Sequence, residues 1–198
     1  MTLHTRTTAR RFRAVGSSTL AAAALLAGTV ATTASPASYA DTSAATRVNQ
    51  AKLTLQTSND ALADCFPHAW AKVKVDLTTD EVGKDRFQIK AKGLQPRTDF
   101  TVFLLEQSGS PFGAAEYIGD FTTNRWGNGY ATFDLIVEEA FAFNNATQER
   151  TDLNAVGFWF ADETADDDCL GEDSPVTGFD GDAAAGVQMM NSGTRLLP

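Results

Sequence analysis

Histidine and cysteine are scarce in this sequence, because its 198 residues contain only two of each. So few nitrogen and sulfur ligands exclude a zinc finger or a metal cage built from cysteine and histidine. Positive charge is also in short supply, with 16 Lys and Arg against 25 Asp and Glu and a net charge of −9. We therefore expect neither nucleic acid nor an anionic membrane as a partner, since such binders need clustered positive charge.

Common catalytic motifs are missing as well. The chain has no G-x-S-x-G, no H-E-x-x-H and no phosphate-binding P-loop. The histidine of any catalytic triad beyond the N-terminal forty residues would have to be His68, which we interpret as a surface or sheet-edge residue. The sequence thus offers no catalytic residue and favours a non-catalytic protein.

The first forty residues have the layout of a secretory signal peptide. Four arginines lie within residues 6–13, a weakly apolar stretch covers residues 14–30, and small residues precede Asp41. The apolar stretch is too short and too weakly hydrophobic for a membrane anchor. We predict cleavage after Ala40, which leaves the Sec and twin-arginine routes open, and we expect an extracellular bacterial protein with no membrane span after cleavage.

Cleavage would remove four arginines and no acid, leaving 158 residues with a net charge of −13. Residues 41–48 are small and polar and predict a flexible lead-in. Residues 49–198 are long enough for one domain with a substantial core, and the C-terminal part of that domain carries an acidic loop region.

Short strand-like runs follow along the predicted mature chain. Residues 70–77 show the clearest pattern, with Val73, Val75 and Leu77 alternating with polar residues, which places one face in a core and the other in solvent. Comparable runs cover residues 51–57, 87–91, 101–105, 117–122, 130–137 and 155–160. Seven short strands separated by turn residues predict an all-β, antiparallel β-sandwich. Residues 138–149 are the only competing helix, and we interpret them as a strand end or a loop with at most one helical turn.

One segment resembles a known sandwich motif. Residues 93–102, GLQPRTDFTV, resemble the G-L-x-P-x-T-x-Y-x-V corner of fibronectin type III and related immunoglobulin-like domains. Phe100 stands where those families prefer tyrosine, so the hydroxyl of the tyrosine corner is missing. The resemblance implies an immunoglobulin-like fold and no particular function.

A second resemblance is to secreted actinobacterial proteins of unassigned activity. The similar segments are residues 119–124 with the turn at 127–129, and the tail 179–182 leading to 186–188. This resemblance implies an exported module and brings no catalytic residues with it.

Cys65 and Cys169 are the only two cysteines in the sequence. In an exported protein, a single disulfide between them is the economical interpretation. The functional alternative is a reactive Cys65 served by His68, and titration of free thiols separates the two.

An acidic run near the C-terminus is the most unusual feature. Nine acids lie within about twenty residues, and no Lys, Arg or His occurs between Arg150 and Arg195. Crowded carboxylates repel one another unless a cation or water separates them, and oxygen ligands suit Ca²⁺. The candidate calcium ligands are Asp166, Asp168, Asp180 and Asp182. The other interpretation, which we favour, is a solvated loop that serves solubility.

Trp126 lies in a predicted turn and is the aromatic residue that we expect to be exposed and to contact a partner.

Taken together, the sequence predicts a secreted, non-catalytic binding module, with calcium as its only candidate cofactor. Its expected ligand is a protein or a carbohydrate, and a basic partner surface would suit the negative charge. The alternatives are a secreted protease inhibitor, with residues 108–112 as the inhibitory loop, or a small hydrolase.

Overall fold

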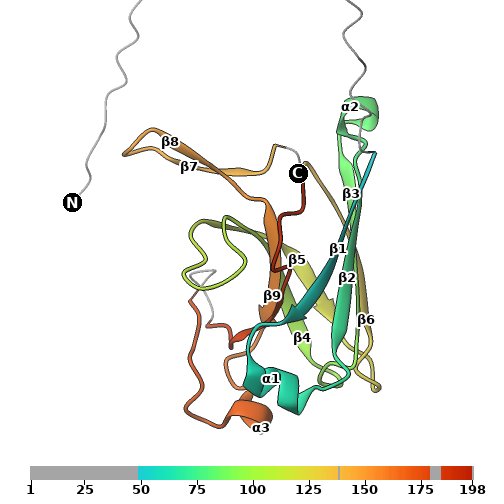
Figure 1. Cartoon of the computed structure of the whole chain (residues 1–198), viewed down its shortest axis with the longest axis vertical. Coiled ribbons are helices and arrows are strands. Elements are labelled where there is room, and N and C mark those ends of the chain that lie inside the picture. The colour runs from blue at the N-terminus through green and yellow to red at the C-terminus, as the bar shows by residue number, and fades with distance from the viewer. Residues whose placement is uncertain (1–48, 138, 179–183, 198) are drawn as a thin grey trace, which may run out of the picture. The chain divides into compact units, whose positions relative to one another are not determined.

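Eight antiparallel strands form one continuous sheet that folds over into two packed layers. The structure is a computed structural model, and it describes residues 49–137, 139–178 and 184–197. Hydrogen bonds join the strands in the order β5-β4-β9-β10-β1-β2-β3-β6. Their bounds are β1 (Gln50–Thr57), β2 (Trp70–Asp76), β3 (Asp85–Lys92), β4 (Asp99–Leu105), β5 (Ala115–Thr122), β6 (Gly129–Leu135), β9 (Ala155–Phe160) and β10 (Gln188–Asn191). The predicted all-β, antiparallel sandwich is confirmed (Figure 1).

The fold divides into a first layer of β1, β2, β3 and β6 and a second layer of β10, β9, β4 and β5. The two layers are joined where the end of β1 pairs with β10, with Gln56 opposite Asn191 and Thr57 opposite Met190.

Three short helices, α1 (Asp60–Cys65), α2 (Thr79–Val82) and α3 (Asp167–Leu170), lie in the connections. None of the helices in the described ranges is both long enough and apolar enough to cross a membrane.

One hydrophobic core fills the space between the layers. The first layer contributes alternate residues, such as Val73 and Val75 of β2 and Ile89 of β3, all of which are buried. This is the period-two pattern that the sequence predicted for β2. The second layer contributes an aromatic cluster in which the ring of Phe100 lies within 5.4 Å of three others, those of Phe121, Phe158 and Phe160.

Glycines allow the two outer strands, β5 and β6, to approach each other. A Cβ atom at Gly119 of β5 would overlap the ring of Phe133 on β6. A Cβ at Gly129 of β6 would lie 2.5 Å from the ring of Phe121 on β5. Each glycine therefore makes room for an aromatic ring of the opposite strand, and the sheet nearly closes on itself at this seam.

The outer surfaces of the two layers differ. In the second layer, all six residues of β9 are buried, because loops cover its outer side. On this outer side, the centre of the Trp159 ring lies 5.4 Å from that of Phe103 and 5.0 Å from that of Phe112. In the first layer, the outward residues of β2, β3 and β6 are mostly exposed. In the second layer, the outer side is open only at β5 and the start of β4, where Tyr117 is 52% exposed and Asp99 and Asp120 are exposed. The first layer thus offers the larger open sheet surface.

The corner before β4 is held by a threonine. The hydroxyl of Thr123 donates to the carbonyl of Gln95 at 2.6 Å and accepts from the backbone N–H of Thr98 at 3.0 Å. Phe100, which follows this corner, lies in the core with no exposed surface. The corner is thus fixed without a tyrosine hydroxyl, and the resemblance to fibronectin type III domains stays a prediction.

Residues 141–152 form a hairpin that the sequence did not predict. Strands β7 (Phe141–Asn144) and β8 (Glu149–Asp152) pair with each other and stand away from the two layers (Figure 1). The side chain of Asn144 closes the turn by accepting from the backbone N–H groups of Ala146 and Thr147. β8 is polar, so no hydrophobic pattern marks it. β10 was also not predicted, because it is short.

The described residues belong to one compact unit. The predicted signal peptide (residues 1–40) and lead-in (residues 41–48) lie outside the described residues, so both stay predictions.

Candidate ligand-binding face

Lysines gather on the outer surface of the first layer. Because side chains alternate along each strand, Lys72 and Lys74 of β2 point to the same side, and the strand pairing places their neighbours beside them. We name this surface the lysine face and define it as Lys52 of β1, Lys72 and Lys74 of β2, and Lys90 and Lys92 of β3. Five of the chain's 16 basic residues therefore share one sheet surface.

Two pairs of lysines lie directly opposite each other. Lys72 faces Lys90 across β2 and β3, and Lys52 faces Lys74 across β1 and β2. Like charges in directly opposed positions destabilise a sheet. The charge of Lys74 is compensated by Asp76, whose carboxylate oxygen lies 2.8 Å from the lysine Nζ. Within the described chain, no ion pair is formed by the other four lysines, Lys52, Lys72, Lys90 and Lys92. The lysine face therefore carries uncompensated positive charge.

Trp70 holds two of these lysines at one end of the face. The Nζ atoms of Lys72 and Lys92 lie 5.6 and 5.8 Å from the centre of its ring. An ammonium over an indole face is attracted by the ring electrons. Trp70 therefore gives two flexible side chains a preferred position.

Polar and aromatic groups border the lysines. Tyr130 of β6 lies opposite Lys90 and is 60% exposed. Its hydroxyl bonds with Gln88 at 3.0 Å and with Thr132 at 2.8 Å, and these bonds tie the ring to the sheet surface. On the other side, Thr54 of β1 lies opposite Lys72. The face thus combines ammonium, hydroxyl and amide groups.

Trp126 is exposed, as the sequence predicted, with 63% of its surface accessible. The side chain of Asn124 accepts from the backbone N–H groups of Trp126 and Asn128 and so forms the turn. The guanidinium of Arg125 lies 3.9 Å from the centre of the Trp126 ring. This turn precedes Gly129, which pairs with Ala91, so Trp126 lies at the same end of the first layer as Trp70.

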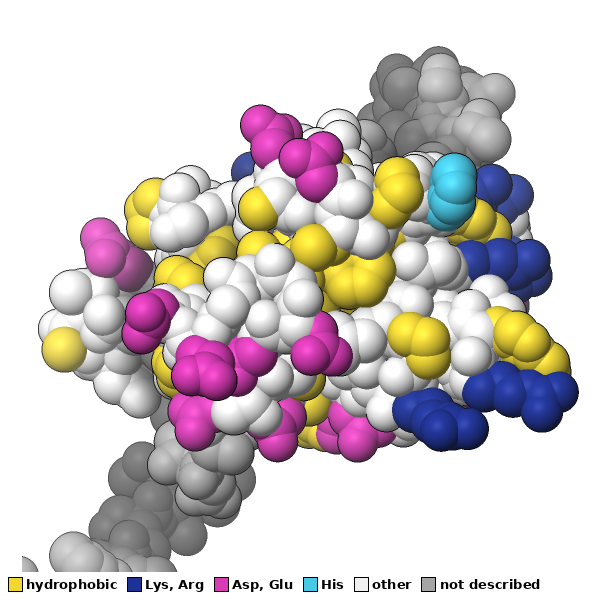
Figure 2. Space-filling view, turned by 90° about the horizontal axis from the view of Figure 1, so that it is seen from below, with side chains coloured by type: hydrophobic (Ala, Val, Ile, Leu, Met, Phe, Trp, Pro, Cys, Tyr) yellow, Lys and Arg dark blue, Asp and Glu magenta, His cyan; other side chains and the backbone are white. Residues whose placement is uncertain are grey.

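Most acidic side chains at the end of the molecule that carries α1 and α3 lie apart from the lysine face. Figure 2 views the end of the molecule that carries α1 and α3, and there the basic side chains gather on one side and the acidic ones on the other. Exposed charges more than about 10 Å apart are largely screened from each other at physiological ionic strength. The net charge of the chain therefore does not describe the lysine face.

Within the acidic region, Asp166 and Asp167 lie in different environments. Asp166 is fully buried, and its carboxylate accepts from the Ser174 hydroxyl and from the backbone N–H of Val187, both at 2.6 Å. Desolvation and the charges of neighbouring acids raise the pKa of Asp167. Asp162 has a lowered pKa, because the backbone and hydroxyl of Thr164 donate to its carboxylate. Asp166 thus serves the local fold, while the negative charge near Asp167 remains uncompensated.

The predicted calcium ligands are only partly described. Asp166 is committed to hydrogen bonds within the protein, Asp168 is exposed, and Asp180 and Asp182 lie outside the described residues. Among the residues that the structure describes, no group of three or more His, Cys, Asp or Glu has the arrangement of a metal site. Calcium binding by the complete loop stays a prediction.

The structure joins Cys65 and Cys169 in a disulfide, as predicted. The bond connects the end of α1 to α3 across 104 positions of sequence. Since both sulfur atoms are used, Cys65 is not available as a nucleophile for His68. His68 itself is exposed, before β2.

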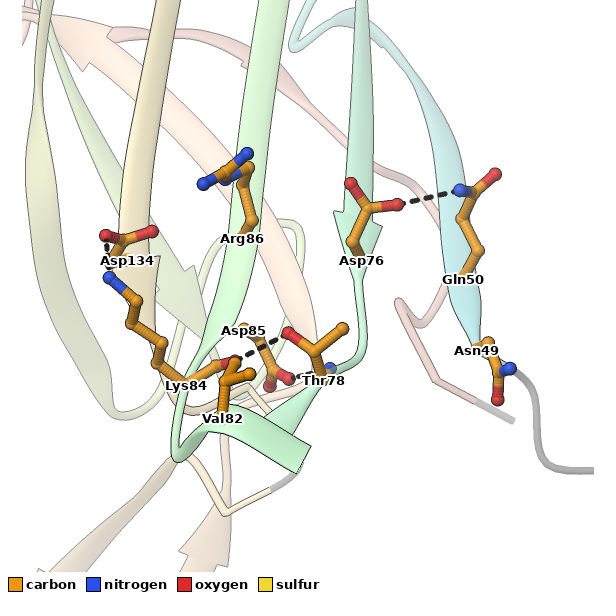
Figure 3. Close-up of a pocket in the computed structure, with 9 residues that line it drawn as sticks. All are labelled: Asn49, Gln50, Asp76, Thr78, Val82, Lys84, Asp85, Arg86 and Asp134. Carbon is orange, nitrogen blue, oxygen red and sulfur yellow. Dashed lines mark hydrogen bonds and ion pairs between the residues drawn. The ribbon is translucent and has the colours of Figure 1, made fainter. Parts of the chain in front are cut away.

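A cleft of about 530 Å³ lies at the opposite end of the first layer, beside α2. Its charged groups are largely paired: Lys84 lies 2.5 Å from Asp134, and Asp76 accepts from Gln50 at 2.7 Å (Figure 3). These contacts lower the pKa values of Asp76, through Lys74 and Gln50, and of Asp134, through Lys84. Because its lysine and its acids have partners, and within the described chain Arg86 forms no ion pair, the cleft has less uncompensated charge for a ligand than the lysine face.

Asp85, at the base of this cleft, is a structural residue. Its buried carboxylate accepts three backbone N–H bonds, from Thr78, Thr79 and Val137, at 2.8 to 2.9 Å. The three bonds fix the start of α2 and the segment after β6. We therefore assign this carboxylate to the local fold and not to a ligand.

The candidate inhibitory loop, residues 108–112, is attached to the second layer. Gln188 donates from its side chain to the carbonyl of Ser108 at 3.2 Å, and the Phe112 ring packs on Trp159. The predicted inhibitory role of this loop stays a prediction.

The sequence interpretation missed the lysine face, although part of its signal is visible in the sequence. Lys72 and Lys74 alternate with apolar residues, and so do Lys90 and Lys92 in the next strand along the chain. Antiparallel pairing of consecutive strands brings such residues together. No protein-family model matches the chain, and no curated protein matches its sequence. The function of the protein therefore has to be inferred from its own residues.

Proposed function

We propose that this protein is an exported, non-catalytic binding module and that the lysine face is its ligand-binding surface. The ligand is anionic, since it has to compensate the ammonium groups of Lys52, Lys72, Lys90 and Lys92. Exposed aromatic residues at the border, Tyr130 and Trp126, supply additional contact area.

The observation that carries this proposal is the direct opposition of Lys72 and Lys90 in a chain with 25 acidic residues. An acid at either position would replace repulsion by attraction and stabilise the sheet. Sequences depart from such local rules mainly at functional sites. The larger open surface of the first layer supports the same choice.

Export is the second part of the proposal. Two features support it: the signal-peptide pattern of residues 1–40 and the Cys65–Cys169 disulfide, since disulfides persist mainly in oxidising compartments. The acidic region near α3 would suit a cationic partner, as the sequence analysis expected, and calcium would add to its stability. Nothing in the described part of the chain favours the inhibitor or hydrolase alternative over a binding module.

Retention on a resin that carries sulfate groups tests the proposed surface. At neutral pH and low ionic strength, we expect the predicted mature chain to bind the resin despite its net charge of −13 and to elute as salt is raised. The double variant Lys72→Gln with Lys90→Gln should lose most of this retention, because it removes two of the uncompensated charges.

The matched control is Lys84→Gln with Arg195→Gln, which changes the net charge equally but leaves the lysine face intact. Lys84 is exposed and paired with Asp134, and Arg195 is an exposed residue near the C-terminus. We expect this control to elute close to the wild type. Equal loss of retention in both double variants would show that the resin senses total charge only and would contradict the proposal.

A further inference from the structure

We propose that the ligand of the lysine face is a linear polysaccharide that carries carboxylate groups. This inference depends on the proposed function and specifies its ligand. It follows from the path of the lysines across the sheet, the polar groups beside them, and the places where aromatic and apolar residues lie.

The lysines follow a diagonal path from Lys92 to Lys52. Lys92 and Lys90 are two residues apart on β3, Lys72 and Lys74 are two apart on β2, and Lys52 lies beside Lys74 on β1. With about 4.8 Å between strands and about 3.4 Å per residue, the path spans roughly 17 Å between backbone positions. Positive charges spaced along such a line suit an extended polymer with repeated negative charges better than a small ligand.

Hydroxyl and amide groups flank the lysines on the neighbouring strands. Thr54, Lys72, Lys90 and Tyr130 form one row across the strands, and Lys52, Lys74, Gln88 and Thr132 form the next. The polar members of these rows can donate to and accept from sugar hydroxyls, while the ammonium groups bind carboxylates. An acidic sugar presents both kinds of group on each unit, so the face matches its chemistry.

The same features disfavour a nucleic acid. Proteins that bind single strands offer free aromatic faces on which successive bases stack. Here cations lie at two of the rings, Lys72 and Lys92 at Trp70 and Arg125 at Trp126, and Tyr130 is a single exposed ring, not a series of stacking faces. All five charged residues on the path are lysines, although arginine is preferred for bidentate contacts with phosphate.

A membrane surface is also disfavoured. Binding to an anionic bilayer combines basic residues with apolar side chains that enter the lipid boundary. The exposed Phe141 and Phe143 lie on the β7–β8 hairpin, and Ile136 lies just beyond β6, outside the lysine rows. No large aliphatic side chain is exposed within those rows.

The test is calorimetric titration of the full predicted mature chain with oligogalacturonate of defined length. We expect binding that salt weakens, that fully methyl-esterified oligogalacturonate does not reproduce, and that Lys72→Gln with Lys90→Gln weakens about tenfold, since each exposed ion pair contributes a factor of a few. Lys84→Gln with Arg195→Gln should bind as the wild type does. Lys72→Arg with Lys90→Arg keeps both charges and should retain most of the affinity, which separates charge loss from misfolding.

Several results would overturn this inference. Equal affinity for the methyl ester would remove the role of the carboxylate, and tighter binding of single-stranded DNA or of phosphatidylglycerol vesicles would assign the face to another ligand. Self-association at low salt that the Lys72→Gln, Lys90→Gln variant abolishes would assign it to a second copy. If oligogalacturonate does not bind while the sulfate resin still retains the protein through Lys72 and Lys90, this inference fails and the proposed function stands.

Discussion

Replacing both cysteines, Cys65→Ser together with Cys169→Ser, should lower the free energy of unfolding by about 3–5 kcal/mol. The disulfide closes a loop with a sequence separation of 104, and opening so long a loop returns much conformational freedom to the unfolded chain. A domain is typically stable by only about 5–15 kcal/mol, so the loss would be a large part of the total. Urea unfolding, followed by tryptophan fluorescence, measures it.

The wild-type protein after complete reduction is the matched control and should unfold at the same urea concentration as the double variant. The disulfide joins α1 to α3, outside the lysine face, so the variant should still bind the sulfate resin under conditions where it is folded. An unchanged unfolding midpoint would show that the bond does not restrain the unfolded chain in the expected way.

Phe100→Ala should lower the free energy of unfolding by about 3–5 kcal/mol. Its ring is fully buried, and its centre lies 5.1 to 5.4 Å from the ring centres of Phe121, Phe158 and Phe160. Truncation removes these contacts and leaves a cavity that surrounding strands cannot fill. Chemical denaturation again provides the measurement.

Phe143→Ala is the control for the loss of an aromatic side chain as such. Phe143 lies on the β7–β8 hairpin and is 46% exposed, so its truncation should cost less than about 1 kcal/mol. Similar losses for Phe100→Ala and Phe143→Ala would contradict the assignment of Phe100 to the centre of the core.

The two layers could be predicted from side-chain alternation, and the residues of β2 show why. Ala71, Val73 and Val75 point into the core, and the lysines between them point outward. This is the pattern expected of a sheet with one buried face and one solvent-exposed face. β9, which the sequence analysis listed among the strand-like runs, is buried along its whole length, because loops cover its outer side. Local pattern was sufficient for both strands.

Pairing with another strand creates the elements that the sequence did not predict. β8 consists of Glu149, Arg150, Thr151 and Asp152, which bury no common face and become a strand only by pairing with β7. β10 lies between β1 and β9, and its partners are far away in sequence. Such strands carry little hydrophobic signal of their own, so they follow from the fold and not from local pattern.

The lysine face was missed for a related reason. Net charge sums the whole chain, and 25 acids conceal the grouping of a few lysines. Alternation predicted that Lys72 would face solvent, but the opposition of Lys72 and Lys90 depends on the register between β2 and β3. A change of one residue in that register would break this row of positive charge.

The most direct measurement of the central claim is lysine footprinting by acetylation and mass spectrometry, with and without soluble dextran sulfate. If the lysine face is the binding surface, the polymer should slow acetylation of Lys72, Lys90 and Lys92 several-fold and leave Lys84 unchanged. Uniform slowing that includes Lys84, or unchanged rates at Lys72 and Lys90 while the polymer is bound, would contradict the assignment of the lysine face as the binding surface.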